Sequence, residues 1–163
     1  MVAAAAVIGV LAIATMRQGK PEQEPVAIAA VPAPQANSPQ CQALLSAVPE
    51  QLGEYRRAAT ADPTPAGTAA WQADAGGEAI ILRCGLDRPA DFVVGVPLQL
   101  VDAVQWFEAK DPTGGRSTWF AVDRPVYVAL TLPQGSGPTP IQQISDVITT
   151  TMPAEPIDPA PPR

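Results

Sequence analysis

The strongest constraint on the fold is one pair of cysteines, Cys41 and Cys84, because the chain contains no others. They lie 43 positions apart, outside any C-x-x-C motif, and the chain has no histidine, so a zinc site would need two thiolates and carboxylates. A disulfide closing a loop of this size would stabilise the fold by about 4 kcal/mol, a large share of the roughly 5–15 kcal/mol typical of a small domain. We therefore expect a disulfide in an oxidising compartment, with two buried thiols as the alternative.

The two ends of the chain differ in composition from its middle. Residues 2–16 form an uncharged apolar run, which as a helix would rise only about 22 Å, short of the roughly 30 Å of a hydrocarbon core. The run therefore predicts a signal or anchor segment at 1–16. Proline-rich stretches follow it at 17–39 and close the chain at 153–163, which predicts a linker and a tail. The remaining residues, 40–152, are expected to form one extracytoplasmic domain.

The basic residues near the apolar run argue for the opposite topology. Arg17 and Lys20 follow the run and no basic residue precedes it, so the positive-inside rule alone would place the domain in the cytoplasm. We give the cysteines more weight and expect a basic leader upstream of this sequence. A cleavage-like Ala12-Ile13-Ala14 leaves two outcomes open, a membrane-anchored domain and a secreted one.

The charge balance excludes some classes of partner. The net charge is −6 and no basic patch is visible, which argues against nucleic acid and against anionic lipid surfaces. Hydrophobic residues make up 47% of the chain, enough for one modest core. The expected partner is therefore an envelope protein or a cell-wall component, with membrane contact only through the N-terminal segment.

Hydrophobic periodicity predicts a helix at each end of the domain and strands between them. Apolar residues from Cys41 to Tyr55 have helical spacing, with Ser38 as N-cap and Pro49 expected to kink or split the helix. A second stripe runs from Ile141 to Met152. Expected strands lie at 68–73, 79–84, 92–94, 98–107, 117–122 and 126–132. The predicted fold class is α+β, a two-layer sandwich of about five mostly antiparallel strands with the N-terminal and C-terminal helices on one face and one disulfide.

Several segments resemble a known family. The pattern Leu82-Arg83-Cys84-Gly85, with Trp71 upstream and Arg124-Pro125-Val126-Tyr127-Val128 downstream, resembles a family of actinobacterial, mycobacterial-type exported or membrane-anchored domains of unknown function. The resemblance covers residues 40–152 and has this Leu-Arg-Cys-Gly core. It implies an envelope location, supports the paired cysteines and transfers no catalytic residue.

The candidate binding residues are one strand arginine and several aromatics. Arg83 lies in an apolar strand, on the face opposite Leu82 and Cys84, where it is either an anion-binding residue beside Trp71 or Trp119 or a member of a structural ion pair. Trp71, Trp119 and Tyr127, together with Trp106, either line a groove for a glycan or peptide or pack in the core and at its edges.

The sequence offers little for catalysis. Without histidine the usual serine and cysteine triads cannot form, and no metal, nucleotide or other cofactor motif is present. Carboxylate pairs such as Glu108 with Asp111 and Asp87 with Asp91 could act as acid and base, and both pairs fall in predicted loops. We therefore predict a non-enzymatic binding or accessory domain of the cell envelope without cofactor or metal. The alternative is a small carboxylate-dependent hydrolase acting on envelope glycans.

Overall fold

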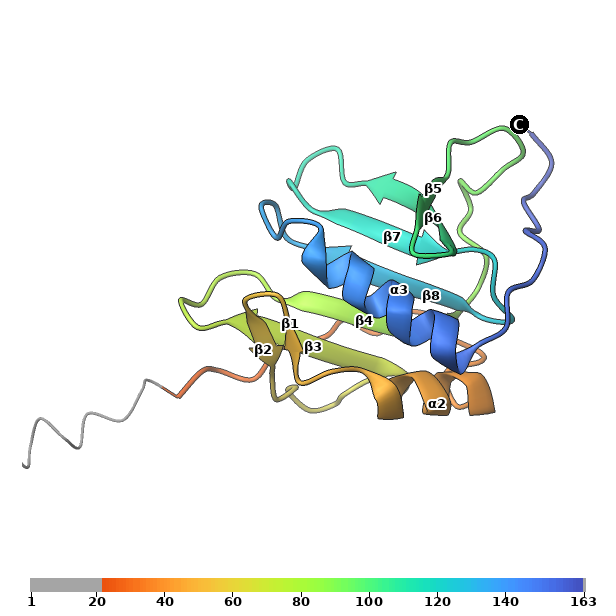
Figure 1. The fold of residues 1–163 in the computed structure, drawn as a ribbon. Helices are drawn as coiled ribbons and strands as arrows, with labels where there is room; N and C mark the ends of the chain where they lie inside the picture. The colour runs from red at the N-terminus through yellow and green to blue at the C-terminus, as the bar shows by residue number, and fades with distance from the viewer. Residues whose placement is uncertain (1–21, 163) are drawn as a thin grey trace, which may run out of the picture.

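Two helices lie on one face of an antiparallel sheet in a computed structural model that describes residues 22–162 (Figure 1). The helices are α2 (Pro39–Ala47) and α3 (Thr139–Thr151), and the sheet has eight strands in the order β1-β2-β3-β4-β8-β7-β6-β5. The strands are β1 (Gln51–Leu52), β2 (Tyr55–Arg57), β3 (Thr68–Ala73), β4 (Ile80–Leu86), β5 (Gln99–Val101), β6 (Val104–Lys110), β7 (Ser117–Ala121) and β8 (Tyr127–Leu132).

The α+β class with two helices, an antiparallel sheet and one disulfide is confirmed, but the sheet has eight strands rather than about five. Part of the difference comes from the predicted first helix. It begins as expected, with the Ser38 side chain accepting a hydrogen bond from the Cys41 N–H, but it ends at Ala47. Pro49 prevents the helix from continuing, and the chain turns at Gly53 (φ +56°) to form the β1–β2 hairpin.

The predicted strand at 98–107 is in fact two strands, β5 and β6. Asp102 and Ala103 both have positive φ, +44° and +65°, and join the strands in a two-residue turn. Such turns usually carry Asn-Gly or Asp-Gly, so Asp-Ala gives little sequence signal. The predicted strand at 92–94 is a loop, in which Phe92 is buried against the Phe107 ring at 5.7 Å between centroids.

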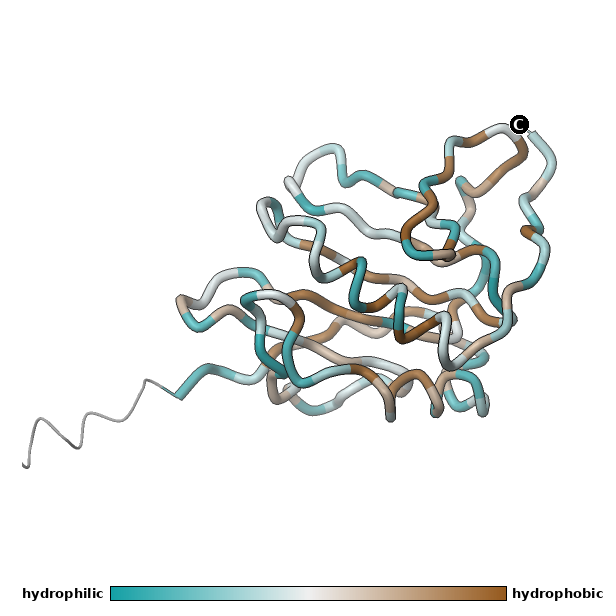
Figure 2. Tube along the Cα trace, viewed as in Figure 1, coloured by the Kyte–Doolittle hydropathy of each residue, from teal (hydrophilic) through white to brown (hydrophobic). Residues whose placement is uncertain are grey.

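The main core lies between the helices and the sheet. Alternation along each strand places one set of side chains under α2 and α3, and Figure 2 shows the matching alternation of hydrophobic and hydrophilic residues along α3. Buried members of this core include Leu44, Trp71, Leu82, Trp106, Leu130, Ile144 and Ile148.

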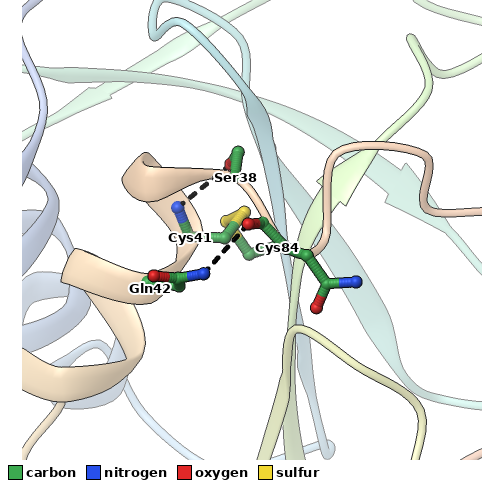
Figure 3. The surroundings of a disulfide bond; sticks show 5 residues. Ser38, Cys41, Gln42 and Cys84 are labelled. Carbon is green, nitrogen blue, oxygen red and sulfur yellow. Dashed lines mark hydrogen bonds between the residues drawn. A yellow bond between two sulfur atoms is a disulfide. The ribbon is translucent and has the colours of Figure 1, made fainter.

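The disulfide joins the first turn of α2 to the middle of this core. Cys41 and Cys84 are bonded, with Cα atoms 5.6 Å apart, and both are fully buried. Figure 3 shows the helix start at Ser38 and Gln42 lying against β4 at this point. The predicted pairing is thus confirmed, and the bond fixes α2 to a central strand.

The predicted linker packs on the opposite face of the sheet over much of its described length. Within residues 22–38, here called the N-terminal segment, Val26, Ile28 and Ala36 are buried, and Val26 forms a parallel bridge with Thr60. The Gln35 N–H also donates to the Gly85 carbonyl at 3.0 Å. The packed unit therefore extends N-terminal to the predicted boundary at residue 40.

The proline-rich tail also contacts the sheet end of the domain. Ala160 bridges Val93 in parallel, and its N–H donates to the Phe92 carbonyl at 3.0 Å. Arg88 pairs with Asp158 at 2.9 Å. Residues 155–160 thus follow the loop that leads to β5, as Figure 1 shows at the C-terminus.

The expected anchor or signal at 1–16 lies outside the described residues. Among residues 22–162, neither helix is long and apolar enough to cross a membrane.

Candidate functional site

The sheet separates the predicted binding residues onto its two faces. Trp71 and Trp119 belong to the face that carries the helices, whereas Arg83 and Tyr127 lie on or beside the other face. An arrangement of Arg83 beside either tryptophan is therefore not formed. The structure instead has hollows on both faces, around Arg83 on one and around Trp119 on the other.

Trp71 is a core residue. Its side chain is fully buried, its indole Nε1 donates to the Pro49 carbonyl at 2.9 Å, and the Arg57 guanidinium lies 5.0 Å from its ring centroid. Trp106 is equally buried and donates to the Ser145 hydroxyl at 3.0 Å. These contacts match the packing interpretation of both tryptophans.

Arg83 lies at the floor of an open trough on the face opposite the helices. Two adjoining hollows of about 450 and 300 Å³ share Arg83, Thr118 and Thr131 in their lining. We call this region the Arg83 trough. The N-terminal segment forms one wall through Ala29 and Val31, and the β6–β7 hairpin contributes Arg116 and Asp111 on the other side.

The guanidinium of Arg83 lacks a carboxylate partner in the part of the chain that the structure describes. Its Nη2 donates to the Ala29 carbonyl at 3.3 Å, and its buried Nε has no hydrogen-bond partner. Partial burial and the nearby charge of Arg116 both lower the pKa of Arg83, burial having the larger effect. The positive charge is therefore poorly compensated by the groups of residues 22–162.

The other polar groups of the trough are largely engaged. Thr118 and Thr131 share a hydrogen bond at 3.0 Å between their hydroxyls, and Arg116 pairs with Glu78 at 3.6 Å. The Asp111 carboxylate accepts bonds from the backbone and hydroxyl of Thr113, and these bonds hold the pKa of Asp111 below its ordinary value. Sequence reasoning missed the two threonines, because only strand register shows that they face Arg83.

The second hollow, of about 410 Å³, lies on the helix-bearing face. We call it the Trp119 groove, and define it by Gln99, Ser117, Trp119, Gln134 and Gln142. It runs between strands β5–β7, the start of α3 and the 133–138 loop (Figure 1). The glutamines come from three different elements, so sequence spacing gives no sign that they meet.

The predicted carboxylate pair Glu108 and Asp111 is split between these faces. Glu108 lies opposite Trp119 in the sheet register and accepts a hydrogen bond from Ser117 at 2.7 Å. Asp111 lines the Arg83 trough. The two carboxylates therefore do not face a common hollow. Asp87, from the other predicted pair, also lines the trough.

Tyr127 lies at the end of β8, beside the tail. Partial burial is the main cause that raises the pKa of its hydroxyl; the charge of Arg88 lowers this pKa and that of Asp158 raises it, both by less. Tyr127 packs against the cluster that contains Phe92 and Phe107. It is thus separated from the Trp119 groove by the sheet itself.

Within residues 22–162, no group of three or more cysteine, aspartate or glutamate side chains is arranged to hold a metal ion. Both cysteines are used in the disulfide.

Comparison with known proteins identifies a family. A family model described as "Protein of unknown function (DUF3515)" matches residues 1–157. Neither the curated proteins nor the solved structures contain a match to the chain.

Proposed function

The chain belongs to this family of proteins of unknown function, and we propose from its geometry that it is a non-enzymatic binding domain outside the cytoplasm. The observation that carries the proposal is Arg83, a partly buried arginine without a carboxylate partner among the described residues, at the floor of an open trough. The ligand would present an anionic group to this arginine.

The cost of burying Arg83 supports an anionic ligand. A buried guanidinium is unfavourable unless it is paired, and charge-assisted bonds to carboxylate or phosphate are the strong form of pairing for arginine. The N–H groups of the two terminal nitrogens that form no hydrogen bond within the described residues would suit a bidentate oxyanion. Binding would also relieve the repulsion between Arg83 and Arg116.

The proposed location rests on the disulfide. A buried disulfide is consistent with an oxidising compartment, and we place the domain at the cell envelope, anchored by residues 1–16 or secreted. An envelope protein or an anionic cell-wall component would then be the partner. Reporter fusions after Leu132 test the location, because only an exported reporter should be active there.

The binding proposal is tested with inorganic phosphate and sulfate as probes. We expect chemical-shift changes at Arg83, Thr118 and Thr131 on titration of the full chain, and at least a tenfold loss of affinity in Arg83→Gln. Arg56→Gln is the matched control, because it removes an equal charge from an exposed ion pair with Asp74. Equal affinity in both variants would refute the proposal.

The alternative function, a carboxylate-dependent hydrolase, is tested by an activity assay. Turnover of an envelope glycan by the purified chain, lost in Glu108→Gln, would replace the binding proposal with an enzymatic one.

A further inference from the structure

The Trp119 groove has a lining that is polar but uncharged. Its side chains include three carboxamides, two hydroxyls and one indole, on a floor completed by apolar residues such as Leu132 and Ile141. No charged residue is among those that line this hollow. Its chemistry therefore differs from that of the Arg83 trough on the opposite face.

The three glutamines are available for a ligand. Gln99, Gln134 and Gln142 are exposed, and Gln99 and Gln134 form no side-chain hydrogen bond within the described residues. The Gln142 side chain likewise forms no hydrogen bond within residues 22–162, which leaves its amide nitrogen free to donate and its oxygen free to accept. A carboxamide both donates and accepts, so a cluster of three matches a ligand with several hydroxyl groups. A purely apolar ligand would leave these groups without partners.

Trp119 supplies the complementary apolar surface. Its side chain is half-buried in β7, and its indole nitrogen forms no hydrogen bond within residues 22–162. A partly exposed aromatic ring offers a flat face to the C–H groups of a pyranose ring while the glutamines reach its hydroxyls. Trp71 and Trp106 cannot act in this way because both are fully buried.

A second hollow extends the groove along the sheet. A neighbouring hollow of about 460 Å³ shares Gln99 with it and continues over β6 toward Pro97, Trp106 and Lys110. Glu108 lines this continuation, with its carboxylate held by Ser117 and Lys110. The continuous surface would accommodate an oligosaccharide.

We propose that the Trp119 groove binds an uncharged oligosaccharide, with one ring on Trp119 and its hydroxyls bonded by Gln99, Gln134 and Gln142. This site is separate from the Arg83 trough, since the sheet lies between them. The inference therefore does not depend on the proposed anion binding.

The test is titration of the full chain with neutral oligosaccharides, triacetylchitotriose and maltotriose, followed by NMR and tryptophan fluorescence. We expect binding of at least one probe, with shifts at Trp119. Gln134→Ala and Gln142→Ala should each weaken it about threefold to tenfold, as expected for loss of one or two hydrogen bonds. Both positions are exposed, so these variants should fold even if Trp119→Ala does not.

The control is Gln105→Ala, which removes a carboxamide from the opposite face of β6, where Gln105 pairs with Leu100. It should leave binding unchanged, as should Arg83→Gln. The proposal is overturned if neither probe binds, if a proline-rich peptide binds the groove instead, or if the glutamine variants bind as well as the control. Loss of binding in Arg83→Gln alone would assign the saccharide to the trough, and would also overturn it.

Discussion

Substitution of Gly85 by alanine should detach the N-terminal segment from the sheet. Gly85 is buried at φ +86°, and a Cβ atom there would overlap the backbone of Gln35 and Ala36. No side-chain rearrangement can relieve an overlap with backbone. The alanine is therefore accommodated only if residues 35–36 move away.

Three effects should lower the free energy of unfolding in Gly85→Ala. A left-handed backbone costs an alanine about 1–2 kcal/mol. Moving the segment also breaks the 3.0 Å bond from Gln35 N–H to the Gly85 carbonyl, worth about 1 kcal/mol, and exposes Ala36, for about another 1 kcal/mol. Gly85→Ala should thus destabilise the protein by about 3–4 kcal/mol.

Gly76→Ala is the matched control, because Gly76 has φ +80° but no atom lies within 4 Å of the place that a Cβ would take. Only the backbone strain of about 1–2 kcal/mol should then appear. With a urea m-value near 2 kcal/mol/M, the two midpoints should differ by about 1 M. Equal midpoints, or unchanged amide protection over residues 22–38 in Gly85→Ala, would refute the reasoning.

Three further predictions concern stability. Replacing Cys41 and Cys84 together by alanine should lower the free energy of unfolding by about 4 kcal/mol for the 43-residue loop, and a loss below about 1 kcal/mol in urea unfolding would contradict this. Arg124→Ala should cost about 3–5 kcal/mol, because it leaves Asp123 as an unpaired buried charge, and calorimetry should show a smaller loss when both are replaced by apolar residues. Hydrogen bonds from Thr113 lower the pKa of Asp111 in the folded state, so they stabilise the fold at pH values above the ordinary pKa of 3.8. This stabilisation is lost as the pH falls through the lower pKa of the folded state. A carboxyl NMR titration measures this pKa, which Thr113→Val should raise.

The local signals of the sequence were sufficient for the helix starts, the disulfide and most central strands. Ser38 and Pro39 mark the start of α2 because an N-cap and a first-turn proline act within a few residues. The stripe from Ile141 to Met152 identifies α3 because periodicity is a property of one segment. The cysteine pair was identifiable because the chain has no other cysteine and no histidine to complete a zinc site.

The motif Leu82-Arg83-Cys84-Gly85 illustrates what local sequence patterns cannot predict. The sequence marked it as distinctive, and alternation correctly placed Arg83 on the other face from Leu82 and Cys84. Its surroundings are not predictable from the motif. The N-terminal segment packs against Gly85 and forms a wall of the Arg83 trough, whereas its proline content predicts a linker.

Only the tertiary structure decided which residues share a hollow. Arg83 meets Thr118 and Thr131 through the register of three strands, and Trp119 meets Gln134 and Gln142 through the docking of α3 on the sheet. No periodic spacing of residues in the sequence indicates either of these contacts. Helical and strand periods report which face of one element is buried, whereas a binding site depends on the relative placement of elements far apart in the chain.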